Sequence, residues 1–230
     1  MEINYRHPFD VNYQEALAIQ KSLREELVLH NDCPLPIKTI AGADISCALH
    51  SDLFFAAVVV HTYPELAIIE ETYAIHKAAF PYIPGLLTFR EGPPLLAAFA
   101  KLRHVPDLVI FDGQGIAHPR GMGLASHMGL LLDIPSIGCA KTRLWGSFSE
   151  PGQKAGDQVP LTYEDSIIGA VVRTKNGVKP LFISQGHRVS LRQAVDVVIS
   201  ACRGYRLPEP VRNAHLAVNR FRQKKTLIGG

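Results

Sequence analysis

The sequence has few cysteines and no pattern that would join them. Its four cysteines lie far apart in 230 residues and form no Cys-x-x-Cys pair; they are Cys33, Cys47, Cys139 and Cys202. A zinc site of paired cysteines and a disulfide framework are therefore both disfavoured, and we predict buried, reduced thiols.

Long hydrophobic runs are also absent. The longest apolar stretches, at 53–60 and 95–100, are too short to cross a bilayer, and the N-terminal "MEINYRHPFD" lacks the apolar centre of a signal peptide. With 47% hydrophobic and 20% charged residues, the chain has the composition of a globular protein. We expect one α/β domain over residues 1–230, cytoplasmic, without membrane contact, and a monomer because no pattern indicates an oligomer.

Charge is distributed unevenly along the chain. Residues 1–172 carry 12 Lys and Arg against 19 Asp and Glu, whereas residues 173–230 carry 12 against 2. The basic part is either a surface that binds a polyanion or a solvated face that neutralises the acidic remainder, and charge alone leaves both open. The acidic residues described below favour phosphate as its partner.

Apolar periodicity predicts the order of the elements. We expect strands near 39–49, 54–63, 67–76, 107–111, 136–140, 167–174 and 180–184, and helices near 11–29, 91–102, 122–132, 190–204 and 209–225. Pro93 and Pro94 are expected in a first helical turn, Ser190 and Gln193 in a capping box, and 150–160 in an exposed loop. A meander of three strands followed by β-α-β predicts a mixed central sheet flanked by helices, the layout of ribonuclease H-like proteins.

Two aspartates interrupt the predicted buried strands. Asp44 lies within "TIAGADIS", and Asp112 ends "LVIFD". A single aspartate there is ordinarily explained by a hydrogen bond in a turn. Two of them, with Glu91 in the first turn of a nearby helix, instead suggest a cluster of oxygen ligands for Mg²⁺.

Other catalytic patterns are incomplete. "GQGIAH" from Gly113 has the first two glycines of a dinucleotide fingerprint, but His118 stands in place of the third. No Walker A lysine and no His-Glu-x-x-His occur, and Ser126-His127 lacks the Gly-x-Ser-x-Gly spacing of a nucleophile elbow. Dinucleotide binding, nucleotide hydrolysis by a P-loop, zinc proteolysis and serine hydrolysis are thus unsupported.

Several long segments resemble a known family. These are "AGAD" at 41–44, "PYIPGLLTFREGP" at 81–93, "DGQGIAHPRGMGLASHMGLLLDIPSIGCAKTRL" at 112–144, "GHRVS" at 186–190 and "GYRLPEP" at 204–210. Together they are similar to endonuclease V, the deoxyinosine 3′-endonuclease, from about residue 11 to 222. The resemblance implies a ribonuclease H-like fold and Mg²⁺, with Mn²⁺ able to substitute. It also implies hydrolysis of the second phosphodiester bond 3′ to inosine in DNA, with RNA possible.

The resemblance also assigns catalytic residues. It places Asp44, Glu91 and Asp112 at the metal. Lys141, after the strand "SIGCA", matches the family's lysine; it offers a point charge to the scissile phosphate or neutralises the acids, and without the resemblance it would be an exposed cap. His215 in "RNAHLA" is implied near the metal, with its role left open.

A second set of residues is implied to bind substrate, namely Tyr82, Gly85, Gly113, Gly115, His118, Arg120 and Leu124. Tyr82 stands between two prolines, which stiffen a loop that wedges into the base stack. The glycines let the main chain approach a flipped base, Leu124 forms an apolar wall, and His118 and Arg120 meet phosphate. The alternatives are a tyrosine packed on the core, turn glycines and a core leucine.

Two other functional classes stay open at this point. A non-catalytic nucleic-acid-binding module has no use for three clustered acids, and a small-molecule phosphohydrolase does not need a basic C-terminal part or an aromatic loop. A metal-dependent endonuclease that recognises inosine therefore agrees best with the sequence.

Overall fold

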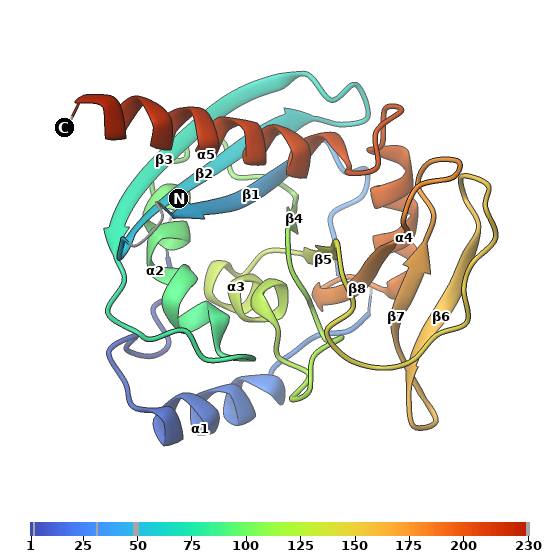
Figure 1. Cartoon of the computed structure of the whole chain (residues 1–230), viewed down its shortest axis with the longest axis horizontal. Helices are drawn as coiled ribbons and strands as arrows, with labels where there is room; N and C mark the ends of the chain where they lie inside the picture. The colour runs from blue at the N-terminus through green and yellow to red at the C-terminus, as the bar shows by residue number, and fades with distance from the viewer. Residues whose placement is uncertain (2, 31, 48–50, 229–230) are drawn as a thin grey trace.

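The computed structural model describes residues 1, 3–30, 32–47 and 51–228 and contains one eight-stranded sheet (Figure 1). Its strands are β1 (Thr39–Cys47), β2 (Leu53–Thr62), β3 (Ile68–Lys77), β4 (Leu108–Phe111), β5 (Ser136–Ala140), β6 (Gln158–Tyr163), β7 (Ser166–Val172) and β8 (Leu181–His187). They are arranged in the order β3-β2-β1-β4-β5-β8-β7-β6. β1, β4 and β5 run parallel, and all other neighbours are antiparallel.

Helices cover both faces of the sheet. They are α1 (Tyr13–Arg24), α2 (Leu87–Phe99), α3 (Leu124–Leu132), α4 (Leu191–Ser200) and α5 (Glu209–Ile228). α2 and α3 pack on one face and α4 on the other, where α5 lies along β1 and β2 (Figure 1). None of the helices in the described part of the chain has both the length and the hydropathy needed to cross a bilayer.

The central strands are apolar on both faces because both faces are covered. In β1 and β4, Ala41 and Val109 point into the cluster with α2 and α3, whereas Ile40 and Ile110 point into the cluster with α4. Successive side chains of a strand point to opposite faces, so a strand buried on both sides reads as a nearly continuous apolar run. β1 from Ile40 to Ala43 and all of β4 are therefore held in the interior of the molecule.

The predicted order of elements is largely confirmed. The meander is present as β1-β2-β3, and the β-α-β unit as β4, α3 and the parallel β5. The last two residues of the strand expected at 39–49 lie outside the described residues.

Several boundaries were predicted wrongly. The expected loop 150–160 ends in β6, an exposed edge strand whose polar residues and Pro160 hide the strand pattern. α2 begins at Leu87, so Pro93 and Pro94 lie inside the helix and Glu91 lies in its second turn. Burial of the surrounding apolar face outweighs the local preference of proline for a first turn. α1 ends at Arg24 rather than near residue 29.

Two local expectations are met only in part. The Ser190 hydroxyl accepts a hydrogen bond from the Gln193 N–H at 3.2 Å, but the buried Gln193 side-chain oxygen accepts none, so half of the capping box forms. All four thiols are free, yet only Cys139 is buried and Cys47 is exposed. Cys47 ends β1, where the strand leaves the covered part of the sheet.

A buried carboxylate on β3 anchors the segment that follows α2. The Glu70 side chain is 5% exposed and accepts hydrogen bonds from the N–H groups of Arg103 and His104 at 3.0 and 2.9 Å, and it pairs with the His104 ring at 2.8 Å. Burial alone would raise the pKa of Glu70, but these hydrogen bonds outweigh it and hold the pKa at about 2.

This depressed pKa predicts an acid-labile contribution to stability. A carboxylate with a lower pKa in the folded than in the unfolded chain stabilises the fold above its ordinary pKa of 4.5, and the contribution disappears as the pH falls toward 2. At pH 7 we expect Glu70→Gln to lower the free energy of unfolding by about 2 kcal/mol, and at pH 3 by less. Urea titrations at both pH values measure this. Exposed Glu65→Gln is the control, and equal stability of Glu70→Gln and wild type at pH 7 contradicts the prediction.

Candidate active site

The two aspartates lie side by side on neighbouring strands in the centre of the sheet. β1 and β4 are parallel with Ala43 opposite Phe111, so the next residues, Asp44 and Asp112, are adjacent. Their side chains are only 12% and 15% exposed. Glu91 reaches the same region from α2: burial, together with the charges of Asp44 and Asp112, raises the pKa of Glu91 to about 7. The three predicted acids thus form one electrostatic unit.

Two basic side chains contact this unit. The Lys141 ammonium, just after β5, forms an ion pair with Asp112. His215 on α5 places its Nδ1 2.7 Å from Asp44 Oδ2. Burial and the charge of Asp112 raise the pKa of Asp44, and the His215 hydrogen bond opposes that rise. The Glu91 carboxylate has no hydrogen-bond or ion-pair partner in the described part of the chain, so its charge is the least compensated.

The prediction that Asp44, Glu91 and Asp112 hold the metal stays a prediction. No three His, Cys, Asp or Glu side chains among the described residues are close enough to hold a metal ion together. The physical reason is repulsion between the carboxylates, two of which are drawn instead to Lys141 and His215. The three residues still fit a hard divalent cation, because all of them offer carboxylate oxygens. Repulsion between the carboxylates raises the pKa of Glu91, and a bound cation would remove that repulsion.

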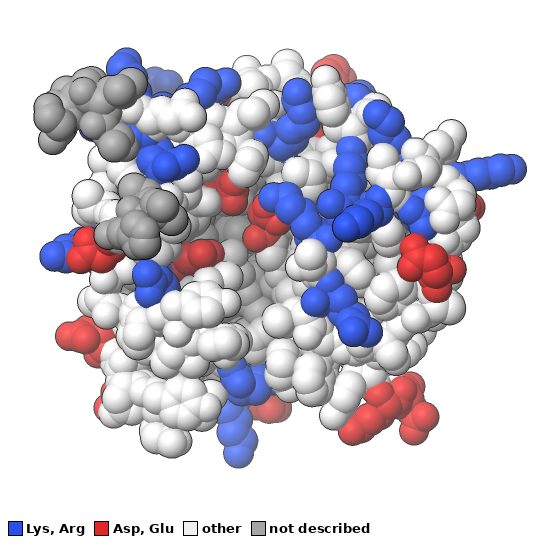
Figure 2. Space-filling view, viewed as in Figure 1, with Lys and Arg blue, Asp and Glu red and all other residues white. Residues whose placement is uncertain are grey.

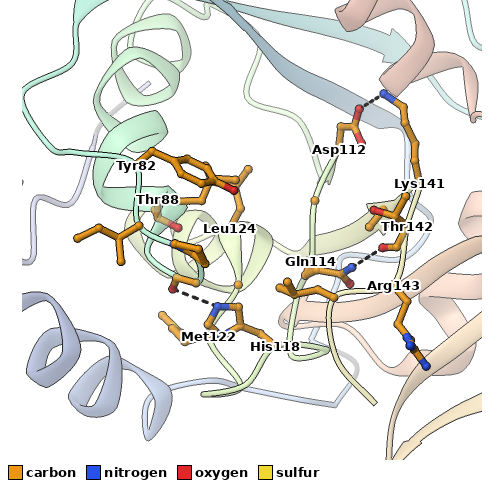
Figure 3. A pocket seen from close by; sticks show the side chains of 18 residues that line it. Tyr82, Thr88, Asp112, Gln114, His118, Met122, Leu124, Lys141, Thr142 and Arg143 are labelled. Atoms are coloured by element: carbon orange, nitrogen blue, oxygen red, sulfur yellow. Dashed lines mark hydrogen bonds and ion pairs between the residues drawn. The ribbon is translucent and has the colours of Figure 1, made fainter. Parts of the chain in front are cut away.

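A cavity of about 470 Å³ opens beside the acids (Figure 3). Asp112 is one of the three acids and also lines this cavity. Tyr82 and Thr88 lie on one side of it, and Lys141, Thr142 and Arg143 lie on the other. Of the residues implied to bind substrate, five line the cavity: Tyr82, Gly85, Gly113, His118 and Leu124. Tyr82 is 70% exposed, so its ring is held at the surface and is not packed on the core.

His118 and Arg120 are engaged differently from the expectation. His118 Nε2 lies 3.1 Å from the Gly85 carbonyl oxygen, and Arg120 Nη2 donates to the same oxygen at 2.6 Å. Burial and the Arg120 charge lower the pKa of His118 to about 4, so the ring is neutral near pH 7. The two side chains hold the Tyr82 loop in this structure. The phosphate contact predicted for them stays untested.

The two glycines after β4 differ in what surrounds them. A Cβ at Gly115 would lie 1.9 Å from the Gln185 carbonyl oxygen, so this glycine is required by close packing against β8, and it does not line the cavity. The expectation that Gly115 admits a base therefore needs correction. A Cβ at Gly113 would lie 3.4 Å from the Leu124 side chain, an ordinary contact, and Gly113 does line the cavity.

Sequence reasoning missed several lining residues, namely Thr88, Gln114, Met122 and Thr142. Gln114 stands between two glycines that were singled out, and that position was the available signal. Its Nε2 donates to the Thr142 carbonyl oxygen at 3.0 Å and so joins the segment after β4 to the segment after β5 (Figure 3).

The surface around the site carries both signs of charge. Figure 2 shows acidic atoms around a central hollow and Lys and Arg atoms gathered on the side above α4 and the beginning of α5. Arg206 belongs to this part of the molecule and donates to the Lys141 carbonyl oxygen at 2.7 Å, which fixes the segment that carries Lys141.

The mixed sheet, with one acid inside β1 and another directly after the adjacent parallel strand β4, defines the class of protein: a nuclease with a ribonuclease H-like fold. The sequence profile of endonuclease V matches residues 21–216, and a Nostoc endonuclease V is 44% identical over 96% of this chain and all of the relative. The chain belongs to the endonuclease V family.

Solved structures agree with this assignment. The Streptomyces avermitilis endonuclease V superposes with a TM-score of 0.90 at 38% identity, covering 95% of this chain and 96% of that one. The Ciona intestinalis endonuclease V has been solved in complex with a 24mer DNA containing an inosine followed by a ribo-adenosine. It superposes with a TM-score of 0.82 at 27% identity, over 92% of this chain and 97% of that one.

Proposed function

We propose that this protein is a Mg²⁺-dependent endonuclease that recognises inosine in DNA and hydrolyses the second phosphodiester bond 3′ to it. The observation that carries the proposal is that Asp112 belongs to the acidic unit and also lines the cavity. One substrate strand can then place a base in the cavity and a nearby phosphate at the acids. The inosine-containing DNA bound by the Ciona intestinalis relative supports this choice of substrate.

Asp44, Glu91 and Asp112 would hold the metal. A bound Mg²⁺ would supply Lewis-acid chemistry: it would polarise the phosphate, lower the pKa of water and stabilise the charge on the leaving oxygen. Water attacks phosphorus, the bond from phosphorus to the 3′ oxygen breaks, and that oxygen takes a proton; the products are a 3′-hydroxyl and a 5′-phosphate. Lys141, released from Asp112, offers its charge to the phosphate. His215 keeps its ring against Asp44 and orients that carboxylate.

The cavity walls suit a purine that has left the base stack. Tyr82 at the mouth fills the space that the base leaves, and Leu124 packs against the base in the cavity. Hypoxanthine presents an N1–H donor and an O6 acceptor, the reverse of adenine, and lacks the 2-amino group of guanine. We expect main-chain groups of the segments that contain Gly85 and Gly113, both of which line the cavity, to read that edge.

The test uses duplexes that differ in a single base. Oligonucleotides with one inosine or a matched adenine, as DNA and as RNA, are incubated with the protein in Mg²⁺ or EDTA, and the ends are mapped. We expect a nick one nucleotide beyond inosine, in Mg²⁺ only. Equal cutting of the adenine duplex, or no cutting by the folded protein, overturns the proposal.

Gly113→Ala separates substrate binding from stability. Because the added Cβ makes only an ordinary contact with Leu124, we expect the free energy of unfolding to change by less than about 1 kcal/mol. The methyl group occupies cavity space, so we expect the affinity for inosine-containing DNA, measured in Ca²⁺ by fluorescence anisotropy, to fall about 10-fold or more. Unchanged affinity would show that the base does not approach Gly113.

A further inference from the structure

Gln20 joins two walls of the cavity from behind. Its side chain, on α1, is 1% exposed, and its Nε2 donates to the carbonyl oxygens of Gly85 at 3.0 Å and Met122 at 3.1 Å. Gly85 belongs to the loop that carries Tyr82, and Met122 belongs to the segment that leads into α3; both line the cavity. A single amide group therefore bridges two loops that are distant in sequence.

The orientation of this amide is fixed by its partners. Both groups facing Nε2 are carbonyl oxygens, which only accept, and Oε1 accepts from Arg120 Nε at 2.6 Å. Rotating the amide by half a turn would place an oxygen against two oxygens and an NH₂ group against a guanidinium. Gln20 thus has one hydrogen-bonding arrangement here.

Gly85 depends on polar contacts for its position. It has no side chain to pack, its φ is +80°, and its carbonyl oxygen is approached by donors of Gln20, Arg120 and His118. Gln20 supplies one of these hydrogen bonds directly and orients Arg120, which supplies another. Loss of the Gln20 amide would remove this donor from the Met122 carbonyl and one of three donors from the Gly85 carbonyl, and it would leave Arg120 without the oxygen that orients it. The hydrogen bonds that tie the two loops to α1 would then be lost.

We propose that Gln20 is a positioning residue that holds the two walls of the cavity at the separation needed to discriminate hypoxanthine from normal purines. The inference rests on the proposed function, because it takes the cavity to be the base site. Discrimination by main-chain groups requires them to be held within a fraction of an ångström, and a misplacement of about 1 Å costs about 100-fold in rate.

The main variant is Gln20→Met, which keeps the length of the side chain and removes its hydrogen bonds. Gln185→Met is the matched control, because the Gln185 amide also donates to two carbonyl oxygens, of Leu29 at 2.7 Å and Val189 at 3.0 Å, and does not line the cavity. For Gln20→Met we expect kcat/KM on inosine DNA to fall about 10- to 100-fold and the preference for inosine over guanine in binding to shrink. For Gln185→Met we expect the preference to be retained.

Gln20→Glu tests the donors alone. A glutamate keeps the acceptor for Arg120 but turns an oxygen toward the Gly85 and Met122 carbonyls, so it should lose selectivity as Gln20→Met does. Its pairing with Arg120 favours folding, which keeps the test valid if Gln20→Met does not fold. Wild-type selectivity in a folded Gln20→Glu protein overturns the proposal.

Hydrogen exchange tests, without substrate, whether Gln20 holds the two loops together. Amides at 83–88 and 121–124 should exchange faster in both Gln20 variants than in wild type and in Gln185→Met. Faster exchange in the Gln20 variants, together with a wild type that does not cut at inosine, would refute the proposed function but not the role of Gln20 in holding the two loops. If the wild type cuts at inosine and the Gln20 variants exchange as slowly as wild type, only the proposed role of Gln20 is refuted.

Discussion

Asp112→Asn is expected to reduce cleavage of inosine-containing DNA by about 1,000-fold or more. Asp112 adjoins Asp44 in the centre of the sheet, affects the pKa of Glu91 and lines the cavity, so under the proposed function metal and substrate meet at this residue. A metal ion stabilises transition-state charge by several kcal/mol, and each 1.36 kcal/mol corresponds to a factor of ten in rate. The measurement is single-turnover cleavage in Mg²⁺.

The same substitution should leave the fold intact. It removes the ion pair with Lys141, but it also removes a negative charge that disfavours ionisation of Glu91 and Asp44. We expect these effects to offset, with a change in the free energy of unfolding within about 1 kcal/mol. Binding of inosine DNA in Ca²⁺ should stay measurable, because the other residues that line the cavity are unchanged and asparagine has nearly the size of aspartate.

Asp196→Asn is the matched control, since Asp196 is exposed on α4 and, among the residues that the structure describes, forms an ion pair only with Arg192 one turn away. It should cut at the wild-type rate. A folded Asp112→Asn protein that retained more than a tenth of wild-type cleavage would show that the acidic unit is not the centre of the reaction.

The sequence predicted the parts of the fold that depend on buried, regular patterns. β1, β2 and β4 are covered on both faces, so each appears in the sequence as an apolar run. The parallel β-α-β unit followed from the spacing of the apolar segments that form β4, α3 and β5. β6 was not predicted, because an exposed edge strand has no such apolar run. The aspartates were found because a charged residue inside an apolar strand needs an explanation.

The polar contacts around the cavity were not predictable in the same way. Gln20 and Gly85 are 65 residues apart in sequence, and nothing in the helical pattern of α1 indicates that this glutamine donates a hydrogen bond to a distant carbonyl oxygen. The family resemblance implied that Arg120 and His118 meet phosphate, which stays a prediction. In this structure both contact a main-chain oxygen, a group that every residue carries and that no sequence pattern reveals. Residue types thus indicated the chemistry, whereas the tertiary contacts show which groups are already engaged.

Gly42→Ala is expected to lower the free energy of unfolding by about 3 kcal/mol. Gly42 lies in β1 where the first turn of α5 crosses it, and a Cβ there would be 2.0 Å from the Pro210 carbonyl oxygen and 2.7 Å from the Val211 nitrogen. Those atoms belong to the backbone, so no rotation of a side chain relieves the clash. β1 is hydrogen-bonded to β2 and β4 on its two sides, so α5 must yield.

Displacement of α5 has a consequence at the active site. His215 lies on α5 five residues after Pro210 and contacts Asp44, which is two residues after Gly42 on β1. We therefore expect the folded fraction of Gly42→Ala to cut inosine DNA more slowly than wild type. Urea titration gives the stability, and cleavage at a temperature where the variant is folded gives the rate.

Gly113→Ala makes the same chemical change at a site with room for the methyl group, so it controls for the general effect of alanine on stability. It should unfold at nearly the wild-type urea concentration, whereas Gly42→Ala should unfold at a clearly lower one. Hydrogen exchange in 209–216 should increase in Gly42→Ala only, because the strain is applied at the start of α5. If Gly42→Ala were as stable as Gly113→Ala, the close approach of β1 and α5 would be wrong, and with it the placement of His215 over the acidic unit.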